Sequence, residues 1–555
     1  MVPVDVLGTT CRDLTALFDA HGYQDSVIFG HAKDGNIHFM LNEQFRDAKQ
    51  LVRYREFTEE MVQLILEADG SLKAEHGTGR IMAPFVRRQF GDELFEVMRE
   101  IKRLIDPKGF LNPGVVLAEE DTDYATDLKV AETVEEEVDR CVECGYCEPV
   151  CPSKDLTLTP RQRIVLRREI AAAEANGDTK LAERLRQEYE YYGVDTCAVD
   201  GMCVTRCPVL INTGDLVRRL RAENQDALGA AGWKFASKHW GTIDKVAGKA
   251  LTAAKMLPFP VVRGATDIGR KLFGEDMVPA YKKGLSAGGA PRVPHAEANP
   301  DIVFFPACVN AMFGGVDGEG KHDPVNATQA FIRLCERAGV KYRVPEGIDQ
   351  MCCGTPWKSK GYTDGYSIMS DRVLKALWEA TDGGRIPIVC DASSCTEGLE
   401  VMRAKVAAAL EHKITQGLGA GEADYAQLKL IDSVQFAADT LLPKLTVSAP
   451  LPSLALHPTC SMTHLGVQPA FEKIANAMSE QVYVPKNWGC CGYAGDRGML
   501  HPELTQSATR AETAELNEHE FAAYISSNRT CEQGMTEATG HTFQNVLQLL
   551  ERATR

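Results

Sequence analysis

The sequence predicts a multidomain α+β protein, in which an all-α domain separates an α+β segment from a duplicated α/β domain. Three observations support this class. The chain has 555 residues, which is more than one hydrophobic core normally organises. Its 18 cysteines are unevenly spread, with seven between 141 and 207 and nine more in groups between 308 and 531. Residues 301–555 contain an internal repeat.

Composition limits where the protein works and what it binds. The formal net charge of −16 argues against a nucleic-acid partner, whose phosphates require a basic surface. The start of the chain lacks a basic segment followed by an apolar run, and "ALTAAKMLPFPVV" is too short to span a bilayer. We therefore expect a cytoplasmic protein, with peripheral contact at the inner face of the cytoplasmic membrane as an alternative. In that compartment clustered cysteines indicate metal binding rather than disulfides, and the isolated Cys11 and Cys335 indicate buried apolar positions.

Residues 1–118 alternate strand-like and helix-like stretches. The run "DSVIFGHAKDGNIHFML" predicts a strand, a Gly/Asp turn and a second strand, with His31 and His38 on either side of the turn. A helix follows and is expected to end at Gly70. Next come Glu75 and His76, just before two glycines. Two imidazoles and a carboxylate form a sound ligand set for a divalent metal, and a histidine beside it can act as a base, although each histidine can equally be a structural hydrogen-bonding residue.

Two connecting segments and a helical domain follow. Residues 119–139 are acidic and read as a linker. Residues 140–222 are expected to be helical, with Thr159 as a helix cap and Pro160 in the first turn. Residues 223–300 form a helical connector that is locally basic within an acidic chain. The basic residues are either a solvated face or a docking surface for anionic lipid or an acidic partner.

The cysteines of residues 140–222 have the spacing of an iron–sulfur protein. "CVECGYCEPVCP" gives the full C-x2-C-x2-C-x3-C-P run, in which the last cysteine serves the other cluster of a two-cluster domain. The first cluster is therefore expected on Cys141, Cys144, Cys147 and Cys207, and the second on Cys151, Cys197 and Cys203. Zinc is the weaker alternative, because tetrahedral zinc sites usually take four ligands in separated pairs.

Asp200 stands where the second cluster should have its fourth thiolate, in "CAVDGMCVTRCP". Three interpretations follow. The second site holds a [3Fe–4S] cluster that lacks one iron; or it holds a [4Fe–4S] cluster with the Asp200 carboxylate or water on that iron; or Asp200 is a turn or N-cap residue and the site is empty. The remaining cysteines keep their spacing, which favours a cluster.

The repeat in residues 301–555 pairs three motifs in the same order. "DIVFFPAC" matches "SLALHPTC", "YRVPEGIDQMCCG" matches "VYVPKNWGCCG", and "VCDASSCTEGL" matches "ISSNRTCEQGM". Two copies of one strand–helix unit are expected to face each other, with a site between them. Vicinal thiolates with further cysteines on both sides suggest a metal site in each copy, and Ser526 stands in the second copy where the first has Cys390. The two sets are Cys308, Cys352, Cys353, Cys390 and Cys395 in the first copy, and Cys460, Cys490, Cys491 and Cys531 in the second.

These cysteine motifs resemble two known domain families. Residues 140–222 are similar to the α-helical ferredoxin domain of fumarate reductase and glycolate oxidase iron–sulfur subunits. The paired CCG units resemble the cysteine-rich domain of heterodisulfide reductase subunits and of lactate and glycolate oxidising complexes. That resemblance implies an additional non-cubane [4Fe–4S] cluster, with zinc, no metal or redox-active thiols as the alternatives.

The runs "VIFGHAKDGNIHF", "GSLKAEHGTGRIMAPFV" and "IKRLIDPKGFLNPGVVL" resemble the C-terminal domain of FAD-linked oxidases, which include D-lactate and D-2-hydroxyglutarate dehydrogenases. The resemblance implies a divalent metal, often zinc, on His31, His38 and Glu75, with His76 as the proton acceptor. It places Asn112 and Gly114 near the flavin. Lys33 and Met40 depart from the family pattern at positions that bear on the substrate acid. No flavin-binding half is recognisable, so FAD is expected from another domain or subunit.

Together these expectations describe an FAD- and iron–sulfur-dependent oxidoreductase. The predicted substrate is a D-2-hydroxy acid, with D-lactate as the first candidate and D-2-hydroxyglutarate or glycolate as others. Electrons would pass through the clusters to a quinone, a cytochrome or an electron-transfer protein. Two alternatives remain: a non-catalytic iron–sulfur electron-transfer subunit, and a thiol redox protein of the heterodisulfide reductase kind.

Overall fold

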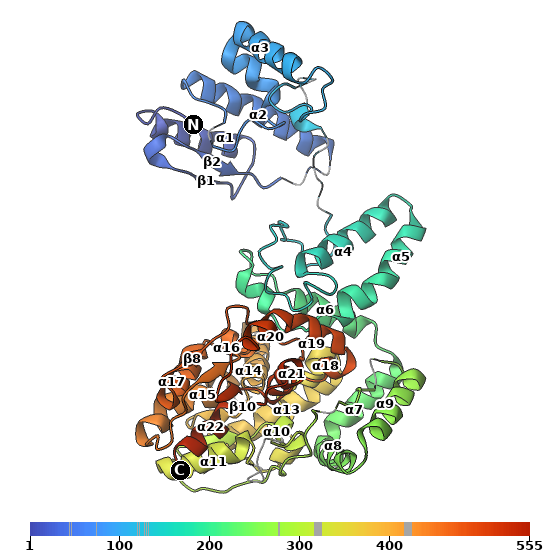
Figure 1. Ribbon diagram of the computed structural model, residues 1–555. Helices are drawn as coiled ribbons and strands as arrows, with labels where there is room; N and C mark the ends of the chain where they lie inside the picture. The colour runs from blue at the N-terminus through green and yellow to red at the C-terminus, as the bar shows by residue number, and fades with distance from the viewer. Residues whose placement is uncertain are drawn as a thin grey trace. The chain divides into compact units, whose positions relative to one another are not determined.

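A computed structural model describes residues 1–555 except 44, 46, 74, 119, 121–122, 127, 129, 131, 276–277, 283, 316–324 and 416–423. The described chain forms two compact units, Met1–Glu132 and Thr133–Arg555 (Figure 1). The division falls inside the predicted acidic linker, several residues of which lie outside the described part. Each unit is treated by itself below.

The first unit packs three helices and a hairpin around one core. The hairpin is antiparallel and pairs Phe29 with His38. Helices α1 and α2 contribute Leu14, Phe18 and Phe57 to the core. The elements are α1 (Leu7–Ala20), β1 (Val27–Phe29), β2 (His38–Met40), α2 (Ala48–Glu67) and α3 (Val86–Ile105), with short 3-10 turns η1 (Ala32–Asp34), η2 (Ala83–Phe85) and η3 (Asp123–Ala125).

The predicted helix end at Gly70 is wrong by three residues. Helix α2 ends at Glu67, and Asp69 rather than Gly70 takes the left-handed conformation, with φ of 52°. Gly70 is needed for a different reason: a Cβ there would lie 2.7 Å from the carbonyl oxygens of Met1 and Ile65. Cys11, predicted to be buried, is only half-buried on α1, whereas Cys335 is fully buried as predicted.

The regular elements of residues 140–222 are all helical, as predicted, and begin at Pro160 after a stretch of turns that carries the first cysteines. Helix α4 starts with the expected cap: Thr159 and Gln162 form a reciprocal capping box, and Pro160 occupies the first turn. The core of this helical domain contains Val138, Ile164 and Leu216. The elements are α4 (Pro160–Ala175), α5 (Thr179–Tyr189), the π-helical turn η4 (Glu190–Asp195), the 3-10 helix η5 (Met202–Arg206) and α6 (Thr213–Glu223).

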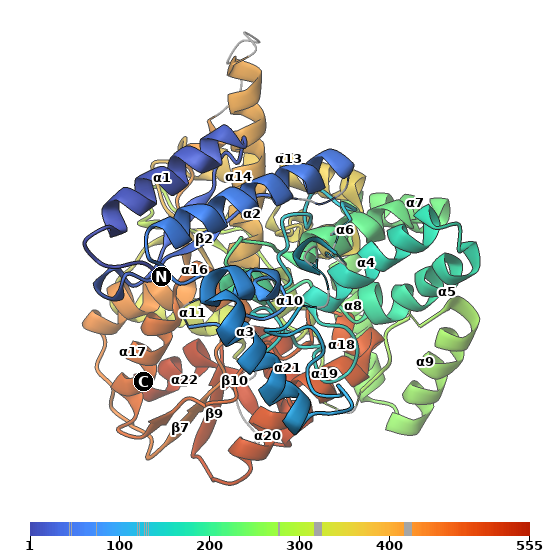
Figure 2. The ribbon, with the colours of Figure 1, turned by 90° about the horizontal axis from the view of Figure 1, so that it is seen from above.

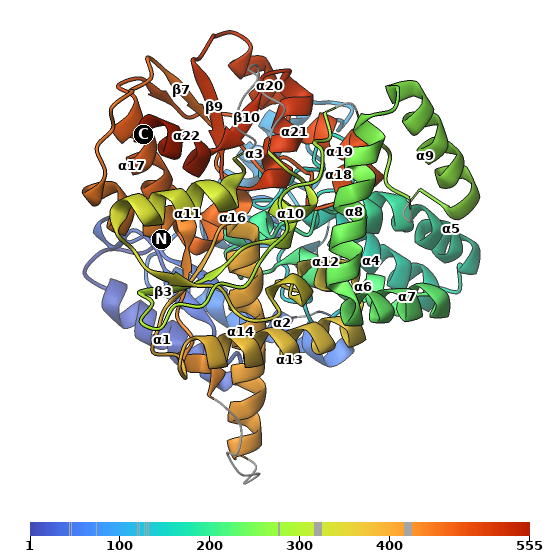
Figure 3. The same ribbon diagram turned by 90° about the horizontal axis from the view of Figure 1, so that it is seen from below.

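The connector forms three helices and then an extended stretch. They are α7 (Ala227–Lys238), α8 (Trp240–Lys255) and α9 (Phe259–Phe273), which lie side by side at one edge of the unit (Figure 3). Lys234 pairs with Asp364 and Lys245 with Asp349, so part of the basic character binds the connector to the cysteine-rich domain. No residue of α9 is buried.

The predicted duplication is present as two parallel four-stranded sheets of equivalent order. The first runs β4-β3-β5-β6 and the second β8-β7-β9-β10, so that each strand has a counterpart at the same place in the other sheet. Strands β7, β9 and β10 lie side by side with α17 and α22 next to them (Figures 2 and 3). The strands are β3 (Ile302–Phe305), β4 (Tyr342–Arg343), β5 (Ile388–Cys390), β6 (Leu430–Asp432), β7 (Leu454–Leu456), β8 (Val482–Tyr483), β9 (Ala523–Ser526) and β10 (Phe543–Asn545).

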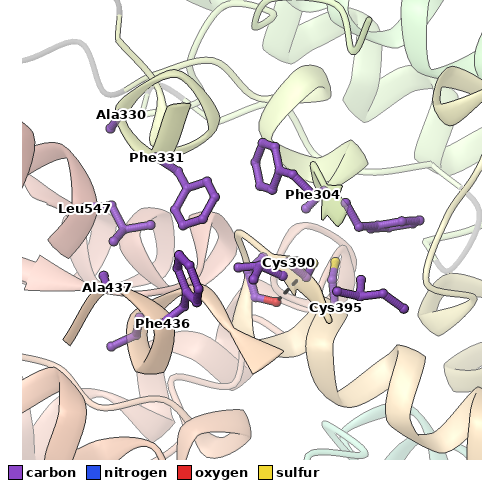
Figure 4. Close-up of a cluster of buried hydrophobic side chains, with 14 of the residues drawn as sticks. Phe304, Ala330, Phe331, Cys390, Cys395, Phe436, Ala437 and Leu547 are labelled. Atoms are coloured by element: carbon purple, nitrogen blue, oxygen red, sulfur yellow. Dashed lines mark hydrogen bonds between the residues drawn. The ribbon is translucent and has the colours of Figure 1, made fainter. Parts of the chain in front are cut away.

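Helices surround these sheets, and the two copies share one apolar core. Figure 4 shows Phe304, Phe331 and Phe436 of the first copy next to Leu547 of the second. The helices of the first copy are α10 (Cys308–Met312), α11 (Ala327–Ala338), α12 (Thr355–Lys360), α13 (Thr363–Ala380), α14 (Ser393–Thr415) and α15 (Ser433–Phe436). Those of the second are α16 (Cys460–Leu465), α17 (Gln468–Met478), α18 (Arg497–Leu500), α19 (Pro502–Ala508), α20 (Arg510–Leu516), α21 (Arg529–Thr539) and α22 (Val546–Ala553).

Across the described residues, none of the helices combines the length and the apolar character that crossing a membrane requires.

Candidate active site and cysteine centres

The first unit brings the four predicted histidine and glutamate residues together. The Oε1 atom of Glu75 lies 2.7 Å from Nε2 of His38, 3.4 Å from Nε2 of His76 and 3.9 Å from Nε2 of His31. The rings of His38 and His76 meet edge to face, with centroids 5.2 Å apart. His38 is half-buried, whereas the other three are exposed. One carboxylate oxygen thus faces three imidazoles at an accessible surface.

The hairpin that carries two of these histidines depends on glycine. Gly35 closes the turn with φ of 62°, and a Cβ there would come within 1.8 Å of the carbonyl oxygen of Val2. A Cβ on Gly30 would lie 2.1 Å from the carbonyl oxygen of Asn36. The backbone N–H of Val2 also donates to the carbonyl of Gly35 over 2.8 Å. The close approach of the first residues therefore fixes the turn between His31 and His38.

The distances within this cluster indicate which residues can bind a metal and which can act as the base. One ligand atom each of His38, Glu75 and His76 lies within 4.8 Å of the others, a spacing that can hold a metal ion. The sequence assigned His31, rather than His76, to that ligand set. Burial acts to raise the pKa of Glu75. Hydrogen bonds from His38 and Asn36 and the charge of His31 outweigh this effect, so that the pKa is lowered. The donor set of imidazole nitrogen and carboxylate oxygen suits zinc and similar divalent ions, and the assignment of His76 as the base stays a prediction.

The turn at Asn112–Gly114 lies beside the loop that follows His76. The backbone N–H of Val116 donates to the carbonyl of Gly79 over 3.1 Å. A Cβ on Gly114 would reach Arg80 at 4.0 Å. Asn112 itself is in the left-handed region, with φ of 45°. Both segments predicted to approach substrate and flavin are therefore neighbours, while their contact with a flavin remains a prediction.

In the second unit, the residues predicted for the second cluster line one cavity. Its wall includes Cys151, Cys197, Cys203 and Asp200. Burial raises the pKa of Cys203 to about 12, and the nearby Asp200, Cys197 and Cys151 add to this. Arg163 is fully buried beside the same thiols, with Nη1 3.7 Å from the Cys151 sulfur. Three convergent thiols around a cavity, next to a buried cation, fit an anionic iron–sulfur cluster.

Asp200 points into this region and is not a helix cap. The residue that caps η5 is Gly201, with φ of 74°, so the N-cap interpretation is wrong. Burial raises the pKa of Asp200 to about 6, against the opposing effects of the Cys490 thiol and His464 next to it. Its Oδ2 atom has no hydrogen-bond partner within the described part of the chain. A fully buried carboxylate oxygen without a partner, at a cavity lined by thiols, fits a ligand to iron.

Three of the first-cluster residues, Cys141, Cys144 and Cys147, share a loop of the same domain, and the fourth, Cys207, follows η5. Burial raises the pKa of the Cys147 thiol to about 11, and the nearby Cys141 and Cys207 thiols add to this effect. Cys144 is exposed on that loop. Arg168 holds the loop, donating to the carbonyl of Cys141 over 3.1 Å. The thiols thus separate into the two groups that the sequence predicts, although the ligand assignment itself stays a prediction.

The first copy of the cysteine-rich domain gathers five thiols at the carboxyl ends of its strands. The Cys308 sulfur lies 3.6 Å from that of Cys352. Thiol hydrogen bonds then join Cys352 to Cys353, Cys353 to Cys395, and Cys395 to Cys390. Hydrogen bonds from Cys352 and Cys395 lower the pKa of Cys353. All five predicted residues meet, and their all-sulfur character fits an iron–sulfur cluster.

The second copy differs from the first. Cys460 lies against Cys490, and a hydrogen bond from Cys531 lowers the pKa of Cys491. Ser526, which replaces Cys390, turns away and donates to the carbonyl of His457 over 2.9 Å. His457 was missed from the sequence, although "HPTC" aligned with "FPAC" places it where the first copy has Phe305. It forms a potential metal-binding group with Cys491 and Cys531.

The predicted single site between the copies is instead two groups of thiols, one in each copy. The loops that carry them meet, because Ser393 Oγ lies 3.2 Å from Ser527 Oγ. Fold and sites together define a multidomain redox protein: a unit with a histidine–carboxylate cluster, a helical domain with two thiol groups, and a duplicated cysteine-rich domain.

Three family models match the chain in the predicted order and confirm the resemblances. Residues 1–116 match the model of the C-terminal domain of FAD linked oxidases. Residues 137–211 match the 4Fe-4S dicluster domain. Residues 302–400 and 454–536 match the cysteine-rich domain, one segment in each copy of the duplication. These matches support FAD and iron–sulfur clusters as cofactors.

Similar proteins of known activity are oxidoreductases acting on CH–OH groups. D-2-hydroxyglutarate dehydrogenase of Haemophilus influenzae is 26% identical over 262 residues, which are 38% of this chain and 25% of that protein. D-lactate dehydrogenase of Archaeoglobus fulgidus is 36% identical over 118 residues, 21% of this chain and 25% of that protein. Glycolate oxidase subunit GlcD of Bacillus subtilis is 32% identical over 109 residues, 20% of this chain and 22% of that protein. The chain therefore spans about a quarter of the length of these relatives.

Proposed function

We propose that this chain takes part in the FAD- and iron–sulfur-dependent oxidation of a D-2-hydroxy acid, with D-lactate as the first substrate to test and D-2-hydroxyglutarate and glycolate next. The observation that carries the proposal is the meeting of His31, His38, Glu75 and His76 in a segment that matches FAD linked oxidases. The histidine–glutamate cluster supplies groups for a divalent metal, with zinc as the proposed ion, and a base beside it.

The residues of this cluster have two roles toward the substrate, metal binding and proton transfer. When bound, the metal lowers the pKa of the substrate hydroxyl, and the flavin accepts the carbon-bound hydrogen with its electron pair. His38, Glu75 and His31 would hold this ion and so position the hydroxy acid. His76, exposed and 3.4 Å from Glu75, receives the hydroxyl proton at Nε2. The step balances as one 2-oxo acid, one proton on the imidazole, and one hydride, a hydrogen with two electrons, which the flavin would take up.

The thiol groups of the second unit supply the route for those electrons. We assign a [4Fe–4S] cluster to Cys141, Cys144, Cys147 and Cys207, and a second cluster to Cys151, Cys197, Cys203 and Asp200, as [4Fe–4S] or [3Fe–4S]. Each cluster passes one electron at a time, so clusters can reoxidise a flavin that has accepted two electrons. The five thiols of the first cysteine-rich copy are the proposed site of an additional cluster.

Contacts within the second unit connect these groups. His464 packs on the loop of the second cluster, since a Cβ on Gly201 would lie 2.8 Å from its ring. Nδ1 of the same ring lies 2.7 Å from Oε1 of Glu397, two residues after Cys395. Asp200 lies beside Cys490 of the second copy. These contacts support electron transfer from the ferredoxin domain into the cysteine-rich domain.

The flavin-binding half is the partner that the first unit requires. Helix α3 buries only Val86 and exposes an apolar stripe along one face, which includes Leu94, Val97, Ile101 and Leu104. Leu104 is 79% exposed. Apolar residues repeated at helical spacing normally pack against a partner. We propose that the flavin-binding domain or subunit covers this stripe.

The electron acceptor is a quinone, a cytochrome or another electron-transfer protein. Helix α9 supports an acceptor at a membrane surface, because its apolar residues Ile268, Leu272 and Phe273 are exposed beside the basic Lys271. We propose a cytoplasmic protein with peripheral contact to anionic lipid. Sedimentation with vesicles that contain anionic lipid, compared with neutral vesicles, tests this, and equal sedimentation would exclude it.

The test of the main proposal is turnover. The purified chain is assayed with D-lactate and an artificial acceptor, alone, with FAD, and with the flavin-binding half added. Turnover that requires the flavin-binding half supports the proposal. Intact clusters without turnover under all three conditions favour the alternative of an electron-transfer subunit. Activity with a disulfide substrate and none with hydroxy acids would favour thiol redox chemistry.

A further inference from the structure

The second copy of the cysteine-rich domain contains a buried histidine in place of an apolar residue. His457 follows β7 and has no exposed surface, like its counterpart Phe305, which lies in the shared core. Burying an imidazole costs free energy unless both ring nitrogens find partners. His457 must therefore have polar or metal partners, which Phe305 in the first copy does not need.

One ring nitrogen of His457 is held by a buried carboxylate. Nδ1 lies 2.8 Å from Oε1 of Glu512, on α20, and the Glu512 side chain is only 2% exposed. This arrangement fixes the orientation of the ring. A carboxylate behind a histidine is the usual second layer of a metal site, because it aims the other nitrogen and raises its basicity.

The other ring nitrogen faces thiols. Nε2 of His457 has no hydrogen-bond partner in the parts of the chain that the structure describes. Ligand atoms of His457, Cys491 and Cys531 lie within 4.8 Å of one another, and all three residues are buried. Cys460 lies near Cys531, so that a fourth donor is at hand. Cys490 lies against Cys460 but also beside Asp200, the proposed ligand of the second cluster.

The chemistry of this set differs from that of the first copy. The cysteine group of the first copy consists of five thiols, and Phe305 stands where the second copy has His457. The second has lost one thiol to Ser526, whose hydroxyl is occupied by the His457 carbonyl, and has gained an imidazole. One nitrogen and three sulfurs is a donor set of structural zinc, which is tetrahedral and redox-inactive. Three of these donors, on His457, Cys491 and Cys531, are buried, and Cys460 is half-buried.

We propose that the second copy binds one Zn²⁺ through Nε2 of His457 and the sulfurs of Cys491, Cys531 and Cys460, with Glu512 as the residue that positions the histidine. The two copies have then diverged in role: the first holds the redox-active thiols, and the second a structural metal beside the ferredoxin loop. This inference does not depend on the proposed hydroxy acid activity.

The test measures zinc, iron and sulfide in the purified full-length chain. It is made in a Glu75→Gln background, so that the histidine–glutamate cluster of the first unit does not contribute zinc. The parent is expected to hold one zinc per chain, and His457→Ala is expected to lose it while iron and sulfide stay unchanged. The matched control is His501→Ala, because His501 is also buried and lies 3.2 Å from a glutamate, Glu503, but belongs to none of the groups among the described residues that could hold a metal. It should keep the zinc.

A second variant guards against a folding defect. Glu512→Gln leaves all four ligands in place and should weaken zinc binding by about 10–100-fold, as loss of a second-layer partner usually does. This is read from zinc retention against a chelator, with far-ultraviolet circular dichroism matching that of the parent. Zinc absent from the parent, zinc retained in His457→Ala, or iron lost in step with His457→Ala would each overturn the proposal. Unchanged zinc retention in Glu512→Gln would remove the assigned role of Glu512.

Discussion

Nε2 of His38 and Oε1 of Glu75 lie 2.7 Å apart, although one residue begins strand β2 and the other lies in the loop beyond helix α2. The contact joins the hairpin to the "EHGTG" loop and draws His31 and His76 toward the same carboxylate oxygen. A single acidic side chain thereby becomes the centre of the proposed metal site.

The two functional groups of that centre can be separated by paired substitutions. Glu75→Gln removes the central ligand charge and should weaken divalent metal binding by more than the 10–100-fold typical of second-layer changes. His76→Ala should keep the metal but lower turnover of the assembled enzyme by about 10²–10⁴-fold, the usual contribution of a general base. Metal analysis and initial rates measure the two effects.

The control for these variants is His21→Ala, because His21 also pairs with a glutamate, Glu60, at 3.4 Å in the same unit, away from the cluster. It should retain both metal and turnover. Loss of metal in His76→Ala to the extent seen in Glu75→Gln would make His76 a ligand and remove it as the base.

Gly35→Ala should destabilise the hairpin and with it the metal site. Two costs are involved: left-handed backbone, which costs an alanine about 1–2 kcal/mol, and the clash of its Cβ with the Val2 carbonyl, worth about 1–3 kcal/mol more. Gly22→Ala isolates the first cost, because Gly22 has φ of 68° and no atom within 4 Å of a Cβ. Thermal unfolding of the two variants gives the comparison. Equal shifts would show that the approach of Val2 is not the constraint on the turn.

Asp200→Cys should change the electron paramagnetic resonance spectrum and the potential of the second cluster, because a thiolate replaces a carboxylate or completes a missing ligand position. The first cluster, on the Cys141 group, serves as the internal control and should keep its spectrum and potential. Asp200→Asn distinguishes charge from ligation. A second cluster identical to wild type in the Asp200→Cys protein would mean that Asp200 is not a ligand.

The pH dependence of stability should contain a contribution from Asp432, a buried acid at the end of β6. Burial raises its pKa to about 6, against hydrogen bonds from Val434, Ser393 and Thr396. A folded-state pKa above that of the unfolded chain stabilises the protein fully below about pH 4, and this contribution is lost as the pH rises through 6. A shift of about two pH units corresponds to about 3 kcal/mol.

Asp432→Asn stays neutral at all pH values and should lose less stability than wild type between pH 4 and pH 7. Urea unfolding across this range measures the difference. Asp439→Asn is the control: hydrogen bonds from Gln435 and Lys473 lower the pKa of this exposed carboxyl, so it is already ionised over most of the range. Parallel pH profiles for wild type and Asp432→Asn would contradict the raised pKa.

Local patterns in the sequence predicted much of the architecture. The Thr159 cap, the hairpin around "GHAKDGNIH" and the order of the duplicated motifs are written into short stretches, where turn chemistry and strand periodicity decide the outcome. The grouping of cysteines followed from their spacing for the same reason. The predicted helix end at Gly70 failed because an aspartate, Asp69, takes the left-handed position.

Contacts between distant elements could not be read from the sequence. The partnership of His457 with Glu512 joins the end of β7 to α20, and the approach of Asp200 to Cys490 joins the ferredoxin loop to the second cysteine-rich copy. Both depend on how the sheets and helices pack, which no local pattern encodes. The replacement of Phe305 by His457 between the aligned copies was the one signal that pointed to the first of them.

The most direct test of the central claim follows electrons from substrate to cluster. The chain is combined anaerobically with its flavin-binding half, D-lactate is added, and the sample is frozen for electron paramagnetic resonance. We expect the signals of reduced clusters with D-lactate, none with L-lactate, and none with D-lactate in the His76→Ala protein. Clusters that dithionite reduces, but that D-lactate, D-2-hydroxyglutarate and glycolate all leave oxidised, would contradict the proposed function.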